Sequence, residues 1–147
     1  MKKWVILLVL GVVFAACEEL ENGIDLGLDE MGTIKLFEQN IIEKNLVITQ
    51  YIEDGEDKSA KFSDYGFLFS TEGTIDAIFN ADTINGTWKI TQEDSIPKIM
   101  INFGDVDEPL KDLNEDWLLE SQSETKIELK DISGKGGSID YLTFEEE

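Results

Sequence analysis

Residues 84–91 are INGTWKIT and residues 98–103 are KIMINF, and in both stretches every second residue shares one chemical character. In the second stretch, Ile99, Ile101 and Phe103 alternate with Lys98, Met100 and Asn102. In the first, Ile84, Trp88 and Ile90 alternate with Thr87, Lys89 and Thr91 in the same way. A period of two predicts β-strands with one buried face. The polar residues 92–95 separate the two stretches, and such a short polar connection predicts a β-hairpin.

The same period recurs along most of the chain. The alternating apolar positions are Leu46, Ile48 and Ile52; Tyr65, Phe67 and Phe69; Ile75, Ala77 and Phe79; Trp117 and Leu119; Ile127 and Leu129; and Leu142 and Phe144. With the two stretches above they predict eight strands at intervals of about ten residues. One segment differs, because Ile34, Phe37, Ile41 and Ile42 have the spacing of one face of a short helix.

Strands joined in sequence by hairpins predict an all-β, antiparallel, up-and-down arrangement with a short N-terminal helix. Eight such strands favour a closed barrel, because an open sheet would leave exposed edges and an uncovered face. A two-sheet β-sandwich is the alternative. A barrel of this size is either filled by its own side chains or holds one small ligand. The longest connection, residues 104–115, contains Pro109, Leu110 and Leu113 and predicts a single helical turn.

The N-terminus has the pattern of an export signal. Lys2 and Lys3 precede an uncharged apolar run at residues 4–16, which is too short to span a bilayer as a helix. Residues 1–16 are therefore predicted to be a signal peptide. Residues 14–17, FAAC, resemble a bacterial lipobox, although Phe14 stands where Leu is usual. Cys17 is the only cysteine and is predicted to carry the lipid, including palmitate, that anchors the protein. The alternative is an ordinary signal peptide followed by a free thiol.

The segment after Cys17 is acidic. Residues 17–32 are predicted to form a flexible tether between the lipid and a barrel domain at residues 33–147. Glu18, Glu19 and Glu21 resemble the signal that exports lipoproteins of Bacteroidetes to the cell surface. An acidic, solvated tether is the alternative explanation. We therefore expect an outer-membrane lipoprotein of the cell envelope, and the acidic stretch favours surface exposure.

The composition excludes several classes of function. The 147 residues include 12 Lys, no Arg, no His and 32 acidic residues, for a net charge of −20. Nucleic-acid binding needs a positive surface, so this surface would repel phosphates. The absence of His excludes a Ser-His-Asp triad, a Cys-His pair and a His-containing zinc site. We expect a monomer that binds no cofactor and is not an enzyme.

Carboxylates are numerous enough to form pairs by chance. Asp105 with Asp107, and Glu115 with Asp116, are such pairs, and nothing in the sequence marks either as a catalytic pair. The acidic segments 54–57 and 105–108 offer oxygen atoms that calcium prefers, but neither has the spacing of an EF-hand loop. A solvated acidic rim is the better interpretation, and we predict no catalytic residue and no metal site.

Residues 44–147 resemble the lipocalin-like lipoproteins of Bacteroidetes, especially those of flavobacteria. The stretches that carry the resemblance are VITQY (47–51), YGFLF (65–69), GTIDA (73–77), NGTW (85–88), INFG (101–104), LNEDW (113–117), KIEL (126–129) and DYLTF (140–144). A Trp is usual in this family near the position of Leu46, and this chain departs from the pattern there. The resemblance implies a calycin-type barrel, and it implies no activity, because a fold does not determine a function.

Six aromatic residues are candidates to line a ligand cavity or to fill the core. They are Trp88, Trp117, Phe67, Phe69, Phe79 and Phe103. Core packing is the favoured interpretation in so small a barrel, with Gly86 expected to make room for the Trp88 indole or to mark a bend. Thr83 and Ser95, within DTI and DSI, resemble acceptors of periplasmic O-glycosylation in Bacteroidetes.

Two functions remain open from the sequence. The first is a binding module for a small apolar or amphipathic ligand, taken up at an open end guarded by residues 104–115. The acidic surface would favour neutral or cationic ligands. The second is a plugged barrel that binds an envelope partner through its outer surface. An interior cavity of a few hundred Å³ would favour the first function.

Overall fold

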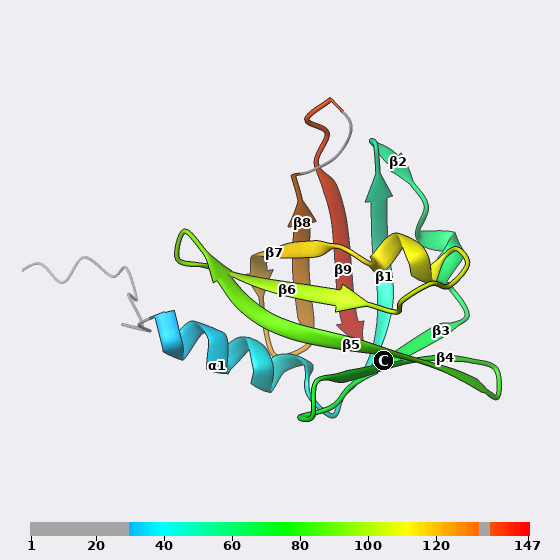
Figure 1. Ribbon diagram of the computed structural model, residues 1–147, viewed down its shortest axis with the longest axis horizontal. Helices are drawn as coiled ribbons and strands as arrows, with labels where there is room; N and C mark the ends of the chain where they lie inside the picture. Colours follow the sequence, from blue (N-terminus) through cyan, green and yellow to red (C-terminus); the bar gives the residue numbers. More distant parts are fainter. Residues whose placement is uncertain (1–29, 133–135) are drawn as a thin grey trace, which may run out of the picture.

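The computed structural model describes residues 30–132 and 136–147 (Figure 1). Its elements are α1 (Glu30–Ile41), β1 (Asn45–Glu53), β2 (Glu56–Asp57), the 3₁₀ helix η1 (Ser59–Phe62), β3 (Tyr65–Phe69), β4 (Thr74–Phe79), β5 (Asp82–Glu93), β6 (Ile96–Asn102), the 3₁₀ helix η2 (Leu110–Leu113), β7 (Asp116–Gln122), β8 (Lys126–Asp131) and β9 (Asp140–Glu146). The signal peptide and Cys17 lie outside the described residues. None of the helices in the described ranges is both long and apolar enough to cross a membrane.

The strands form one closed antiparallel barrel. Each strand from β3 to β8 pairs with the next in the sequence, and β1 pairs with both β3 and β9, which closes the sheet. The two-residue strand β2 extends the sheet beside the end of β1 only, so the closed barrel has eight strands. The predicted up-and-down barrel is confirmed, and the two-sheet sandwich is wrong.

A β-bulge in β1 changes which residues face the core. The pairing of β1 with β9 is regular up to Ile48 and shifts before Gln50. Beyond the shift Tyr51 is buried at 2% exposure, whereas Ile52 is only half-buried. The sequence pattern had placed Ile52 on the inward face and Tyr51 on the outward face, and this is corrected. An extra residue in a strand reverses the alternation after it, and a simple period of two cannot predict that.

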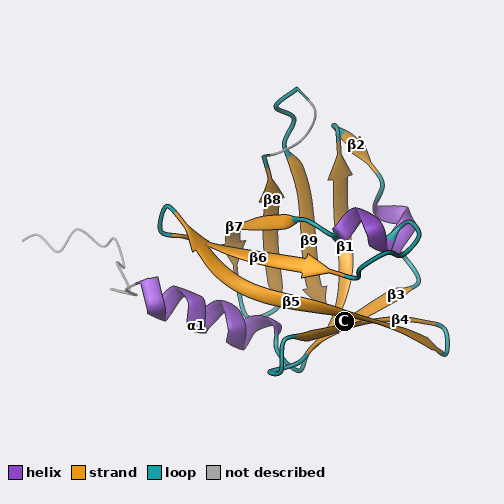
Figure 2. Cartoon of the chain, viewed as in Figure 1, coloured by secondary structure: helices purple, strands orange, loops and turns teal. Residues whose placement is uncertain are grey.

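Helix α1 closes one end of the barrel, which we call the helix end (Figure 2). Phe37 and Ile41 are buried on its inner face, as their spacing predicted. The Asn40 side-chain amide donates to Gln122 Oε1 at the end of β7, at 3.0 Å. After the helix, the Glu43 N–H donates to the Phe69 carbonyl of β3 at 3.0 Å. The first residues of α1 overlap the segment expected to be tether.

Gly86 makes room for Phe103 and not for Trp88. A Cβ atom at Gly86 would lie 2.7 Å from the Phe103 ring and 2.9 Å from the Asn102 carbonyl oxygen. Asn102 is the last residue of β6, the strand beside β5 in the barrel wall, and Phe103 follows it. The expectation of space for the indole is therefore corrected: the glycine allows close packing of Phe103 against β5.

Gly86→Ala is expected to lower the free energy of unfolding by about 2 kcal/mol, because the added methyl group must displace a buried ring and a strand carbonyl. Urea unfolding monitored by tryptophan fluorescence measures this. Gly66→Ala is the matched control on β3, since a Cβ there meets nothing within 4 Å. We expect the control to change stability by less than about 0.5 kcal/mol. Equal effects of the two substitutions would contradict the tight contact at Gly86.

Candidate functional site: the barrel interior, its mouth and its outer wall

Each of the two tryptophans of the barrel forms a hydrogen bond with the backbone, one at either end of the barrel. Trp88 Nε1 donates to the Ser70 carbonyl in the β3–β4 hairpin, at 3.0 Å. Trp117 Nε1 donates to the Leu113 carbonyl at the end of η2, at 3.2 Å. An indole N–H buried without a partner would be costly, so each ring is held where a backbone oxygen accepts its hydrogen bond. Both rings are buried, Trp88 at 8% and Trp117 at 1% exposure.

The remaining candidate aromatic residues also lie in or against the core. Phe67, Phe69 and Phe103 are buried, and Phe79 is half-buried with its ring 5.0 Å from the Tyr65 ring. Phe144 of β9 packs edge-to-face against Phe67 at 5.5 Å and against Phe69 at 5.6 Å. These rings pack against one another inside the barrel, so they fill space that a ligand would otherwise occupy.

The end of the barrel opposite α1, which we call the mouth, is closed by an apolar plug. Two short 3₁₀ helices lie together there, on the other side of the molecule from α1 (Figure 2). Helix η1 places the Phe62 ring 5.2 Å from Tyr51, edge to face. Helix η2 follows Pro109, as predicted, and buries Leu110 and Leu113. The segment expected to guard an open end is therefore packed into it.

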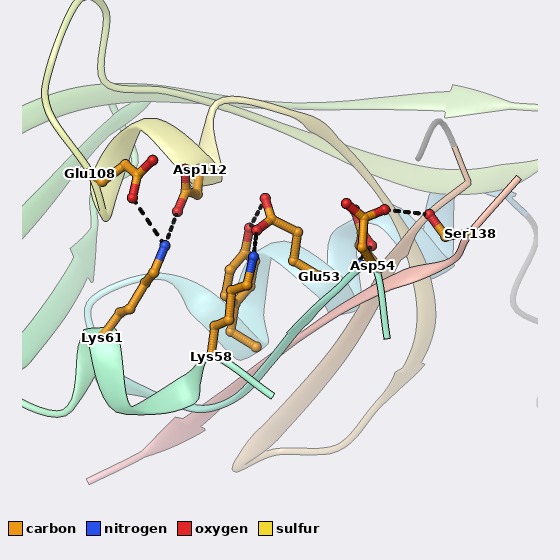
Figure 3. Close-up of polar contacts among 9 residues, drawn as sticks. Glu53, Asp54, Lys58, Lys61, Glu108, Asp112 and Ser138 are labelled. Atoms are coloured by element: carbon orange, nitrogen blue, oxygen red, sulfur yellow. Dashed lines mark hydrogen bonds and ion pairs between the residues drawn. The ribbon is translucent and has the colours of Figure 1, made fainter. Parts of the chain in front are cut away.

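A polar layer joins the two plug helices across the mouth (Figure 3). Lys61 of η1 contacts two carboxylates of the η2 segment, Glu108 at 3.2 Å and Asp112 at 3.0 Å. These hydrogen bonds, that with Asp112 first, raise the pKa of Lys61 above its usual range. The lysine therefore keeps its charge at neutral pH. Because Lys61 is exposed, the two ion pairs orient the helices more than they stabilise them.

A second polar group at the mouth surrounds Tyr51. The Tyr51 hydroxyl donates to Glu53 Oε1 at 3.3 Å, and Lys58 pairs with the other oxygen of the same carboxylate (Figure 3). The Tyr51 N–H donates to Ser59 Oγ at 2.8 Å, which attaches η1 to β1. Burial, and after it the negative charge of Glu53, raises the pKa of the Tyr51 hydroxyl well above its usual range.

The acidic segment 54–57 forms hydrogen bonds within the protein. The Asp54 N–H donates to Asp140 Oδ1 at 2.8 Å, and Ser138 Oγ donates to Asp54 Oδ1 at 2.8 Å (Figure 3). Asp57 Oδ1 accepts the Ser59 N–H at 3.0 Å. Within residues 30–132 and 136–147, no three Cys, His, Asp or Glu side chains gather as metal ligands would. The turn joins β1 to β9 through side chains.

Asn114 closes the base of the connection between β6 and β7. Its Oδ1 accepts the Phe103 N–H at 2.6 Å, and its Nδ2 donates to the Gly104 carbonyl at 2.9 Å. One side chain thus bridges the two ends of the loop that carries η2. The sequence contained no specific signal for this role, because Asn is common in loops for several reasons.

One opening in the outer wall lies where two neighbouring strands part, and we call it the wall crevice. Strands β1 and β3 pair only at Asn45–Leu68 and Leu46–Phe67, and beyond these pairs they part. A cavity of about 400 Å³ occupies this region. Its lining residues are Asn45, Val47, Ser63, Asp64, Tyr65, Gly66, Phe67, Ile78, Asn80 and Glu147.

Two further cavities lie on the outer wall. One of about 450 Å³ lies beside β6, β7 and β8, where Lys98 pairs with Glu93 at 2.8 Å and Asp116 at 3.2 Å. Burial, followed by the charges of Asp131 and Asp116, raises the pKa of Glu115 in this cavity. The other, of about 470 Å³, is lined by Thr74, Asn85, Gly86, Thr87, Asn102, Phe103 and Gly104.

The structure leaves other candidate residues apart from these sites. Thr83 is exposed near the start of β5, and Ser95 is exposed in the turn between β5 and β6. Both therefore stay candidate O-glycosylation acceptors.

Sequence reasoning missed Phe62 and Lys61, because the four residues of η1 are too few to show a period. It also missed Gly66, although a glycine inside a strand often marks a place where a ligand or another backbone segment approaches the strand closely.

Comparison with known proteins adds a fold similarity. No family model and no curated protein matches the chain. The crystal structure of a DUF4847 family protein from Bacteroides vulgatus matches 76% of this chain and 97% of its own, with a TM-score of 0.53 and 16% identity. The two proteins share a fold. Japanin from the tick Rhipicephalus appendiculatus, solved bound to cholesterol, covers 74% of this chain and 77% of its own at 13% identity and a TM-score of 0.41.

Proposed function

We propose that the protein is a lipid-anchored, non-enzymatic binding module of the bacterial cell envelope that binds its ligand on the outer wall of a plugged barrel. The packed interior carries the proposal. Large side chains, among them Trp117, Tyr51 and Phe67, are almost completely buried inside the barrel. The described cavities of a size that suits a ligand open on the outer wall.

The anchor is supported by the N-terminal pattern. A short apolar run after Lys2 and Lys3 ends at the lipobox-like residues 14–17, and Cys17 is the only thiol available for acylation. Two or three acyl chains hold a protein on a membrane stably. The outer membrane is the proposed location, and the acidic residues after Cys17 favour its outer face.

A carrier function is the second candidate. The mouth is covered by two short helices, and they are linked through Lys61 by exposed ion pairs, which contribute little to stability. A small apolar ligand that displaced Phe62 and the η2 leucines would then reach the core. Acidic side chains at the mouth, including Glu53 and Glu108, would favour a neutral or cationic ligand.

Mass spectrometry of the protein purified from its own envelope tests the proposal. Under denaturing conditions the mass is expected to equal residues 17–147 plus two or three acyl chains. Under native conditions we expect no enclosed apolar ligand, because the interior is already filled. A retained sterol, fatty acid or similar molecule lost on denaturation would instead support the carrier. An unacylated chain would contradict the lipid anchor. The native mass spectrum would still decide whether the barrel encloses a ligand.

A further inference from the structure

We propose that the wall crevice is a binding site for a small amphipathic amine in its protonated form. This inference rests on the proposed function and specifies its site and ligand class. The crevice exists because β1 turns away from β3 after Leu46 while β3 stays paired with β4 along its whole length. Tyr65 and Gly66 pair with β4 and not with β1, so this edge of β3 has no neighbouring strand of the barrel beside it and can be approached by a ligand.

Gly66 provides the floor of the crevice. It lies in the middle of the exposed stretch of β3 and pairs with Ile78 of β4. A Cβ added at Gly66 would meet no atom within 4 Å, so the space above this residue is open. The other outward position of β3, Leu68, carries a side chain and lies where β1 and β3 are still paired. The glycine therefore produces a hollow at the place where the strands separate.

The walls of the crevice are apolar. Val47 of β1 lines one side, and Ile78 of β4, 37% exposed, lines the other. Tyr65 and Phe67 also contribute to the lining from β3, and their rings stack at 6.2 Å. Phe67 is already buried, so a short alkyl chain or an aromatic ring placed over Gly66 would cover the exposed surfaces of Val47 and Ile78 and remove them from water.

The two ends of the crevice are polar and acidic. Asp64 precedes β3 and Asn80 follows β4, so both lie toward the mouth, whereas Asn45 and Glu147 lie toward the helix end. None of the ten lining residues is a lysine, although the chain has 12. Among the described residues, no ion pair neutralises Asp64. An ammonium group beside this carboxylate, with its apolar part over Gly66, matches the charge and polarity of the crevice.

Three probes that share one phenethyl group test the site: phenethylammonium, 2-phenylethanol and 3-phenylpropionate. Saturation-transfer NMR titrations use the full chain in lipid nanodiscs, with empty nanodiscs as the blank. We expect saturable binding of the amine, weaker binding of the alcohol and none of the anion. Gly66→Phe fills the crevice and is expected to abolish saturable binding. Met100→Phe is the matched control, because it adds a ring at an exposed strand position outside the described cavities.

A charge variant separates electrostatic recognition from shape. Asp64→Asn is expected to weaken amine binding about threefold, the effect of one partly exposed ion pair, and to leave the alcohol unchanged. Asp94→Asn, in the turn at the opposite end of the barrel, should change neither affinity. Amine binding that survives Gly66→Phe would overturn this site while leaving binding elsewhere on the outer wall intact. Absence of saturable amine binding to the wild type would overturn the ligand class, whereas outer-wall binding in general would be overturned by an enclosed ligand in the native mass spectrum.

Discussion

Trp117→Ala is expected to lower the free energy of unfolding by about 4 kcal/mol, one of the largest effects available to a single substitution in this barrel. The indole is 1% exposed and donates its N–H to Leu113, which holds η2 in the mouth. Its ring also contacts Tyr51, 6.4 Å away and steeply inclined. Removing it leaves a cavity below the plug and takes away one of the two hydrogen bonds that the Leu113 carbonyl accepts, since the Glu115 N–H also donates to this oxygen at 2.8 Å, and both costs add.

Trp117→Phe separates the two costs. The phenyl ring keeps much of the packing, whereas the Leu113 carbonyl still loses the indole N–H and keeps only the Glu115 N–H. We expect this variant to lose about 1–3 kcal/mol. Urea unfolding measures both variants. A loss of less than about 1 kcal/mol for Trp117→Ala would contradict a packed mouth, since a side chain that lines an empty cavity has few contacts to lose.

Stabilisation of Trp117→Ala by a small aromatic molecule tests directly whether the barrel interior is filled. Free indole is expected to raise the melting temperature of Trp117→Ala, because an apolar cavity of this kind binds aromatic molecules. The wild-type protein should show no such rise, since its own side chain fills the space. An equal rise in the wild type would indicate an existing interior cavity and would favour the carrier function.

The strands were predictable because their chemistry repeats with a period of two. In β5 and β6 the inward residues Trp88, Ile99 and Ile101 have the burial that alternation requires. In β1 the alternation is broken by the bulge before Gln50, so Tyr51 and Ile52 exchange roles. A bulge depends on how two distant strands are paired, and local sequence carries little information about that pairing.

The mouth and the wall crevice were less predictable for a related reason. Phe62 is one apolar residue in a polar stretch, and only its contacts with Tyr51, Tyr65 and Phe67 make it part of the plug. Gly66 is one glycine in an apolar strand, and its role depends on the separation of β1 from β3. Both features arise where segments distant in the sequence meet. The sequence predicted the strands of the barrel and most of their inward-facing residues, but it could not predict where two strands of the wall separate.

Tyr51 is expected to make the protein unfold readily in alkaline solution. The unfolded chain loses the tyrosine proton near pH 10, the ordinary value for this side chain. Burial and the neighbouring Glu53 raise the pKa of the folded hydroxyl well above that value, so the folded state keeps the proton. Below pH 9 the stabilisation is complete. Above pH 10 the folded state binds more protons than the unfolded state, and stability falls by about 1.4 kcal/mol per pH unit for this group.

Urea unfolding at pH 8, 9, 10 and 11 measures this slope, and Tyr51→Phe should flatten it. The hydrogen bonds of Lys58 and Lys61 raise the pKa of each ammonium group in the folded state, and loss of these protons acts in the same direction. High salt screens those exposed pairs and leaves the buried hydroxyl largely unaffected, so measurements in 1 M NaCl isolate Tyr51. Tyr141→Phe, on β9, controls for the removal of a tyrosine hydroxyl. If Tyr51→Phe kept the wild-type alkaline slope at high salt, the ring would be reaching water through the mouth, and the plug formed by η1 and η2 would open without unfolding of the barrel.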